Sequence, residues 1–134
     1  MKARSRLSRS SDFQRVYRQG SSTASRFLVL YYFRRSPGTD GEGPRIGLSV
    51  SKRLGGAVVR NRVKRLLREA FRVCEARLAQ EFDYVVIARP QLLELVEGDR
   101  KGAVTQALVE LLDKVSLLGS TDTPVPPGAG SGDA

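Results

Sequence analysis

The feature that most constrains the fold is a basic segment, residues 55–72, which reads GGAVVRNRVKRLLREAFR and holds six Lys or Arg residues but one acid. Apolar residues continue at helical spacing from 57 to about 79 without an interrupting proline or glycine. This pattern predicts an amphipathic helix of about six turns. The helix needs a sheet or other helices to cover its apolar stripe, which comprises Val59, Val63, Leu66, Leu67, Ala70, Cys74 and Leu78.

The opposite side of this helix is almost purely cationic. At about 100° per residue, Arg60, Lys64 and Arg68 fall on one line. Glu69 is the single acid between residues 60 and 72, so the like charges repel one another unless a partner neutralises them. Asn61, Arg65 and Arg72 lie beside that line. An ordinary solvated face is the alternative interpretation.

The charge of the whole chain supports a polyanionic partner. Residues 1–80 carry a net charge of +14 and residues 81–134 a net charge of −5. Arg outnumbers Lys by eighteen to five, and the planar guanidinium pairs bidentately with phosphate and stacks on bases. Nucleic acid is therefore the expected partner.

Before the basic helix, the pattern predicts a short helix over residues 12–19, with Ser11 as N-cap and Gly20 as its end. Two strand-like segments follow at 25–35 and 44–52. The turn formers between them predict that the two strands pair as an antiparallel hairpin.

After the basic helix, residues 83–89 (DYVVIAR) are apolar on both phases and predict an interior strand. Residues 101–118 predict a second amphipathic helix. The last sixteen residues, 119–134, are rich in Pro, Gly and Ser, and we expect a disordered tail there after a single domain over 1–118.

The composition gives no support for a disulfide, a zinc site or a membrane span. The chain has one cysteine, Cys74, and no histidine, so neither an internal disulfide nor a Cys/His zinc site is expected. We expect Cys74 to be a core residue, since it lies in the apolar phase of the helix. The longest apolar run of the chain, residues 27–33, is far shorter than the roughly 20 residues of a membrane span. We therefore expect a soluble, cytoplasmic protein without membrane contact.

We do not expect the acidic residues of the basic part of the chain, residues 1–80, to form a hydrolytic site. Phosphodiester hydrolysis by a protein needs histidines or clustered carboxylates that hold metal ions. Here the carboxylates are scattered, so we expect no catalytic residue and no metal site in the protein; they are Asp12, Asp40, Glu42, Glu69 and Glu75.

Residues 47–72, GLSVSKRLGGAVVRNRVKRLLREAFR, resemble the signature region of the bacterial ribonuclease P protein family. The hallmark of that family is an Arg-Asn-Arg helix that continues as x-Lys-Arg-x-x-Arg, and this chain has that spacing from Arg60 to Arg68. The resemblance extends over roughly residues 5–118 and leaves out the tail.

The resemblance implies an α/β fold, an α+β two-layer sandwich with element order α-β-β-β-α-β-α. It also implies a mixed four-stranded sheet with a left-handed β-α-β crossover, although about 98% of such crossovers are right-handed. The implied function is that of the protein subunit of ribonuclease P, which helps a catalytic RNA remove the 5′ leader of precursor tRNA. In that enzyme Mg²⁺, bound mainly by the RNA subunit, and the RNA itself perform the cleavage.

Carried over by motif, two groups of residues are expected to contact RNA. Contacts to the catalytic RNA fall on the basic helix, at Arg60, Asn61, Arg62, Lys64, Arg65 and Arg68. Contacts to the leader fall in a cleft between the sheet and the first helix, at Phe13, Tyr17, Tyr31, Ser49 and Lys52. Single strands are held by aromatic rings beside cations, which agrees with this second group. We expect Tyr31 to share its face of the strand with Phe27, Val29 and Phe33.

Two other functions remain open at this stage. A ribosomal or RNA-chaperone protein would share the charge and the fold type, but would not require aromatics beside the Arg-Asn-Arg helix. A DNA-binding regulator would place its basic helix in a major groove. That is disfavoured here, because a helix that buries an apolar stripe and leads into an interior strand already belongs to a core, and we expect no DNA partner.

Overall fold

The computed structural model describes residues 6–7, 9–36, 43–97 and 102–117. The expected tail at 119–134 and most of the expected turn between the two strand-like segments lie outside these residues. The helices and strands, in chain order, are α1 (Ser10–Gln19), β1 (Ser21–Ala24), β2 (Leu28–Arg34), β3 (Arg45–Ser49), α2 (Ala57–Cys74), β4 (Phe82–Ala88), α3 (Leu92–Glu97) and α4 (Ala103–Lys114).

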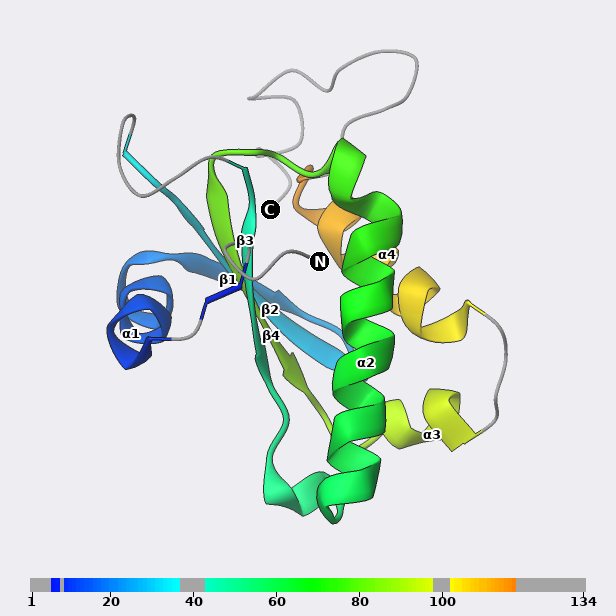
Figure 1. The fold of residues 1–134 in the computed structure, drawn as a ribbon. Coiled ribbons are helices and arrows are strands. Elements are labelled where there is room, and N and C mark those ends of the chain that lie inside the picture. Colours follow the sequence, from blue (N-terminus) through cyan, green and yellow to red (C-terminus); the bar gives the residue numbers. More distant parts are fainter. Residues whose placement is uncertain (1–5, 8, 37–42, 98–101, 118–134) are drawn as a thin grey trace.

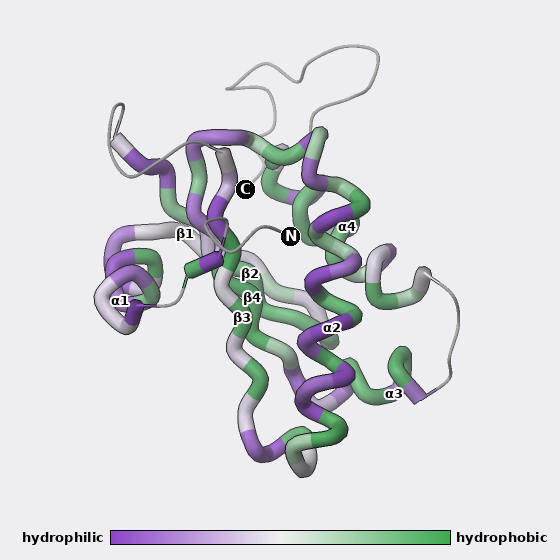
Figure 2. The backbone as a smooth tube through the Cα atoms, viewed as in Figure 1, coloured by the Kyte–Doolittle hydropathy of each residue, from purple (hydrophilic) through white to green (hydrophobic). Residues whose placement is uncertain are grey.

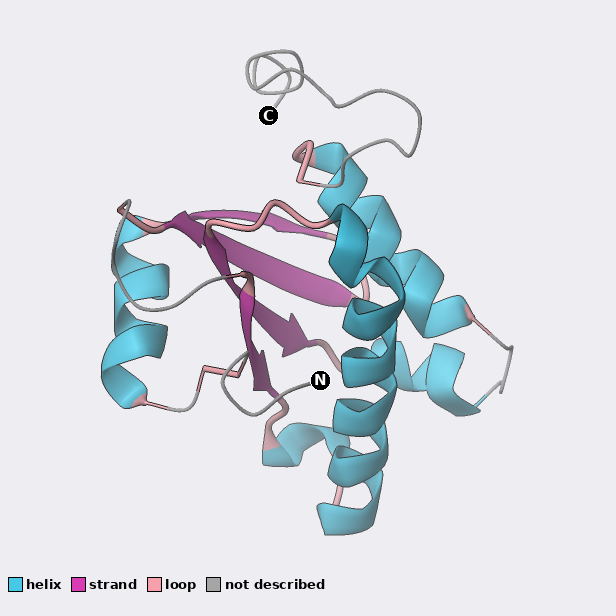
Figure 3. Cartoon of the chain, turned by 45° about the horizontal axis from the view of Figure 1, so that its top comes forward, coloured by secondary structure: helices cyan, strands magenta, loops and turns pink. Residues whose placement is uncertain are grey.

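A twisted four-stranded sheet and a layer of helices form the body of the molecule (Figures 1 and 3). The long helix α2 lies on one face of the sheet together with α3 and α4, whereas α1 lies on the other face. This agrees with the expected α/β sandwich. The element order also agrees, apart from the short helix α3, which the sequence pattern did not predict.

The strands are ordered β1-β2-β4-β3, with β4 antiparallel to β2 and parallel to β3. The predicted hairpin between the second and third strands is therefore wrong, because β4 lies between them. The physical reason is that β4 has apolar residues on both faces and so takes a position buried on both sides. Its interior placement confirms that part of the prediction.

Helix α2 connects the two parallel strands β3 and β4, and the crossover is left-handed (Figure 1). A 3₁₀ turn, Lys52–Leu54, follows β3, and Gly55 then adopts φ 143°, a conformation that L side chains rarely take. Glycine thus allows the chain to reverse directly into α2. Regular α2 ends at Cys74, earlier than predicted, and continues as a 3₁₀ turn, Glu75–Arg77.

The main core lies between α2, α4 and the sheet. Hydrophilic and hydrophobic segments alternate along α2 (Figure 2), and the predicted stripe supplies Val63, Leu67, Ala70 and Cys74 to this core. Cys74 is a buried free thiol, as predicted, and donates to the Ala70 carbonyl at 3.3 Å. The buried stripe begins later than expected, because Val59, its first predicted residue, is exposed.

Helix α1 differs from the prediction at its start and agrees with it at its end. Arg9, not Ser11, occupies the N-cap position and makes no side-chain cap, so the predicted N-cap is wrong. Gly20 ends the helix, as predicted. A Cβ there would lie 2.4 Å from the Tyr32 carbonyl oxygen and 2.6 Å from that of Val16, so close backbone packing requires glycine at this position.

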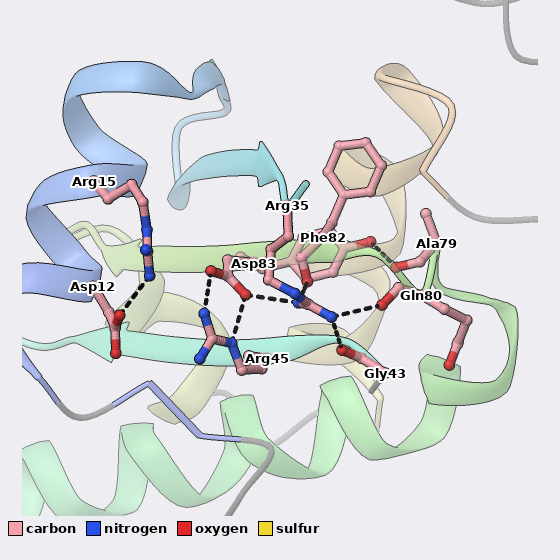
Figure 4. Close-up of polar contacts among 10 residues, drawn as sticks. Asp12, Arg15, Arg35, Gly43, Arg45, Ala79, Gln80, Phe82 and Asp83 are labelled. Atoms are coloured by element: carbon pink, nitrogen blue, oxygen red, sulfur yellow. Dashed lines mark hydrogen bonds and ion pairs between the residues drawn. The ribbon is translucent and has the colours of Figure 1, made fainter. Parts of the chain in front are cut away.

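A buried ion cluster joins the start of β3, the start of β4 and the residue that follows β2 (Figure 4). The Asp83 carboxylate is 0% exposed and accepts from Arg35 at 2.8 Å and from Arg45 through two bonds of 2.8 Å. Arg35 is 7% exposed and also donates to the carbonyls of Phe82, Gly43 and Gln80. Every charge in this cluster is paired, which is the condition under which buried ions are tolerated.

We predict that Asp83→Ala destabilises the fold by about 3–5 kcal/mol, because it leaves Arg35 buried without its counter-charge. Urea denaturation followed by circular dichroism measures the loss. The matched control is Glu94→Ala, which breaks the exposed pair with Arg26 at 3.3 Å and should cost less than about 1 kcal/mol. Similar small losses in both variants would contradict a structural role for the cluster.

Candidate nucleic-acid interface

The cations of α2 do not form one uniform face. Arg60, Lys64 and Arg68 are half-buried, and Lys64 and Arg68 face β3, whereas Asn61 and Arg65 are exposed. Their neighbour Arg62 turns toward α3 and donates a long hydrogen bond of 3.5 Å to the Val96 carbonyl. The structure therefore divides the six predicted contacts into an inner row, an outer row and one residue at the α3 seam.

A small pocket of about 100 Å³ lies beside the inner row. Lys64 and Arg68 line it from α2, and Leu7, Ile46 and Leu48 line it from the N-terminal segment and β3. Arg6 provides a third cation, which the sequence reasoning missed. Its position depends on a bridge between residues 6 and 46 and on a hydrogen bond from the Leu7 amide to the Ile46 carbonyl at 2.9 Å. No local sequence pattern predicts that pairing.

The inner row is suited to phosphate. The Nε atom of Arg60 is buried and has no hydrogen-bond partner among the described residues. The pocket lining contains three cations and no carboxylate. Cations held side by side without an acid repel one another, and an anion relieves that repulsion.

The predicted leader residues meet on the other face of the sheet. Phe13 and Tyr17 come from α1 and Tyr31 from β2, and all three are half-buried in one cluster. The Phe13 and Tyr17 rings lie 6.3 Å apart, and the Tyr17 and Tyr31 rings 5.0 Å apart, both edge-on. Ser49 of β3 hydrogen-bonds Tyr17. Four of the five predicted leader residues are thus brought together.

The fifth residue and one aromatic lie elsewhere. Lys52 is exposed in the 3₁₀ turn beyond the end of β3. Phe27 packs against the main core on the α2 side, so its predicted position beside Tyr31 is wrong. The reason is that Phe27 precedes β2, where strand alternation does not yet apply. Phe33 does share the face of Tyr31, as predicted.

Gly47 permits the close approach of α1 to the sheet. A Cβ at this position would lie 2.6 Å from the Phe13 ring and 3.2 Å from the Leu7 Cβ. On this face of β3, Phe13 therefore covers Gly47, whereas Ser49 stays partly exposed. The aromatic cluster and the basic pocket lie on opposite faces of β3, and Leu7 borders both.

The described residues hold no group of three or more His, Cys, Asp or Glu side chains that could bind a metal ion. Asp83, the carboxylate most deeply buried among them, already accepts hydrogen bonds from two arginines. The side chains described here therefore do not fit a metal centre. In the same residues, no helix combines the length and the hydropathy that crossing a bilayer requires.

Comparison with known proteins identifies the family. The family model for ribonuclease P matches residues 1–115. This chain belongs to the ribonuclease P protein family. The ribonuclease P protein component of Bacillus pumilus is 46% identical over 101 residues, which span 75% of this chain and 82% of that protein.

Solved structures of ribonuclease P proteins share the fold. The protein from Staphylococcus aureus is 33% identical with a TM-score of 0.73, and the match covers 87% of this chain and 99% of that one. The protein from Thermotoga maritima is 31% identical with a TM-score of 0.70, and the match covers 80% of this chain and 94% of that one. The resemblance noted in the Arg-Asn-Arg helix thus extends to the whole ribonuclease P protein fold.

In this ribonuclease P protein, the contact between Tyr17 and Ser49 is testable by titration. Burial raises the pKa of the Tyr17 phenol, and the hydrogen bond from Ser49 partly offsets that rise because it stabilises the phenolate. We predict that Ser49→Ala raises the pKa of Tyr17 further, as measured by NMR titration of the Tyr Cζ signal. Ser51→Ala removes a hydroxyl that instead accepts from the Arg53 amide, and should leave this pKa unchanged.

The same group affects stability at high pH. The unfolded chain releases the phenol proton at about pH 10, whereas the folded chain retains it to a higher pH. Stability should therefore fall as the pH rises between the two pKa values. A Tyr17 pKa that is equal in the wild type and in Ser49→Ala would contradict the hydrogen bond.

Proposed function

We propose that this chain is the protein subunit of ribonuclease P and that it binds the catalytic RNA and the 5′ leader of precursor tRNA at two different surfaces. The observation that carries the proposal is the pairing, in the ribonuclease P protein fold, of a carboxylate-free cationic row on α2 with a half-buried aromatic cluster under α1. Cations bind phosphate whatever the sequence, and aromatics bind unpaired bases.

The RNA-subunit surface comprises the polar side of α2. We assign it Arg60, Asn61, Arg62, Lys64, Arg65 and Arg68, and we add Arg6, which shares the pocket of Lys64 and Arg68. Packing of the opposite side of α2 into the core fixes the backbone that carries the inner row of Arg60, Lys64 and Arg68. A preformed row loses little conformational entropy when it meets a phosphate backbone.

The leader surface comprises Phe13, Tyr17, Tyr31 and Ser49, with Lys52 beyond the end of β3. A leader on this surface is single-stranded, so its bases are free to stack on the half-buried rings. Ser49 and the Tyr17 hydroxyl offer hydrogen bonds at the same place. This surface adds affinity for precursor tRNA, while mature tRNA has no segment to place on it.

Ribonuclease P is a metal-dependent ribonuclease, and the cleavage chemistry belongs to its RNA. We propose that the metal is Mg²⁺ and that the RNA subunit binds it, since the described side chains do not fit a metal centre. The protein supplies positive charge and substrate binding. We propose that the protein acts in the cytoplasm. We further propose that residues 1–118 form its single domain and that residues 119–134 lie outside that domain.

A reconstitution assay tests this function. The purified protein alone should not cleave precursor tRNA at any Mg²⁺ concentration, whereas the protein with its RNA subunit should produce the mature 5′ end. The RNA alone should need more Mg²⁺ for the same rate, because the cations of the protein then no longer offset phosphate repulsion. Accurate cleavage by nuclease-free protein would overturn the proposal, as would an RNA subunit whose Mg²⁺ requirement the protein leaves unchanged.

The α2 surface is tested by the salt dependence of RNA-subunit binding. The exposed Arg65 and the α3-side Arg62, both replaced by Ala, should weaken binding and reduce the log–log salt slope by roughly 0.7–0.9 per lost phosphate contact. Lys114→Ala removes one exposed cation from the end of α4 and is the control, with an unchanged slope. If the slope of the double variant equals that of the wild type, α2 carries an ordinary solvated face.

The leader surface is tested by comparison of two substrates. Tyr31→Ala in the reconstituted enzyme should weaken binding of precursor tRNA by about 1–3 kcal/mol, the usual contribution of an aromatic ring to the binding of one base. Binding of mature tRNA and of the RNA subunit should stay the same. Loss of a core aromatic would destabilise the fold by roughly 3–5 kcal/mol and impair all three, so equal losses would assign Tyr31 to the core instead.

A further inference from the structure

The aromatic cluster under α1 continues beyond the predicted leader residues. Phe33 lies two positions after Tyr31 in β2, on the same face, and is half-buried against the same cluster. Two strand residues span roughly 6.8 Å, about twice the 3.4 Å rise between bases in a duplex strand. Tyr31 and Phe33 are therefore far enough apart to contact different bases.

A guanidinium accompanies Phe33. Arg15 of α1 lies over the Phe33 ring, with its Cζ atom 6.0 Å from the ring centroid. An ion pair of 2.6 Å with Asp12, one helical turn earlier, holds Arg15 in this position (Figure 4). The Arg15 side chain is still 34% exposed. An aromatic ring beside a partly exposed, ion-paired arginine is a combination that binds the base of a single strand.

The β4 residues aligned with Tyr31 and with Phe33 differ in polarity. Tyr31 is aligned with Val85 of β4, whereas Phe33 is aligned with Asp83, which pairs with Arg45 of β3. The strand position beside Phe33 therefore holds an ion-paired carboxylate, whereas the position beside Tyr31 holds an apolar side chain. A nucleotide beside Phe33 would meet charge as well as a ring.

We infer that Phe33 and Arg15 form a second stacking position for the leader, next to the one at Tyr17 and Tyr31. This inference rests on the proposed function. The occupant is one further unpaired nucleotide of the precursor, whose base contacts the Phe33 ring and the Arg15 guanidinium together. Each position binds a separate base, so each contributes a separate increment of affinity as the leader lengthens.

A leader-length series tests the inference. Precursor tRNAs with leaders that grow one nucleotide at a time are bound to the reconstituted enzyme, and the affinity is measured for each. The wild-type affinity should rise in steps. Phe33→Leu, which keeps an apolar side chain but removes the ring, should lose one step of about fivefold or more. Tyr31→Ala should lose a different step.

Two further variants make the result specific. Arg15→Ala, a change at a partly exposed side chain, should reduce the same step as Phe33→Leu without impairing folding. Phe27→Leu is the matched control, because Arg26 lies over the Phe27 ring at 5.1 Å in a similar pair at the other end of β2, packed on the α2 side. It should retain every step.

The outcomes separate this inference from the function on which it rests. If Phe33→Leu and Arg15→Ala retain every step while Tyr31→Ala loses one, the second position does not exist and the proposed function stands. If the wild-type affinity does not rise with leader length, both are overturned. A Phe33→Leu variant whose affinity for mature tRNA falls as much as its affinity for precursor has a folding defect, and an intact step in Arg15→Ala then decides against the inference.

Discussion

The structure depends on the burial of one side of α2. A helix with so many cations and so few acids is destabilised when it stands alone, since its like charges repel one another. The apolar stripe overcomes this repulsion when it packs between the sheet and α4. That packing places α2 in the crossover from β3 to β4 and orients its cationic side outward. The fold and the proposed RNA-binding surface therefore depend on the same amphipathic segment.

Much of the fold was predictable because it follows from periodicity. The stripe of α2, the two-sided apolar pattern of β4 and the glycine that ends α1 are local signals, and the structure confirms them. The hairpin prediction failed for a non-local reason. Turn residues between two strands show that the chain reverses, but they do not show that a later strand with two apolar faces will insert between the two. Helix α3 is too short for a periodicity signal.

The candidate site was predictable where residues share a helix and less so where they meet across the chain. The Arg-Asn-Arg spacing predicted which α2 residues carry charge, yet not that Arg62 turns toward α3 while Lys64 and Arg68 line a pocket. Arg6 reaches that pocket through a single bridge to Ile46. Asp83 appeared in the sequence as one acid inside an apolar strand, and only its two arginine partners, distant in sequence, explain its burial.

The short pairing of the N-terminal segment with β3 also affects an edge of the sheet. The outer edge of a sheet presents unpaired amide and carbonyl groups to which a strand of another molecule adds readily. Here the Leu7 amide occupies part of the β3 edge, and the opposite edge is β1, four residues long and mostly exposed, of the sequence SSTA. Short, polar or occupied edges are poor templates for aggregation. The described sheet edges therefore offer few backbone groups to which another molecule could add a strand.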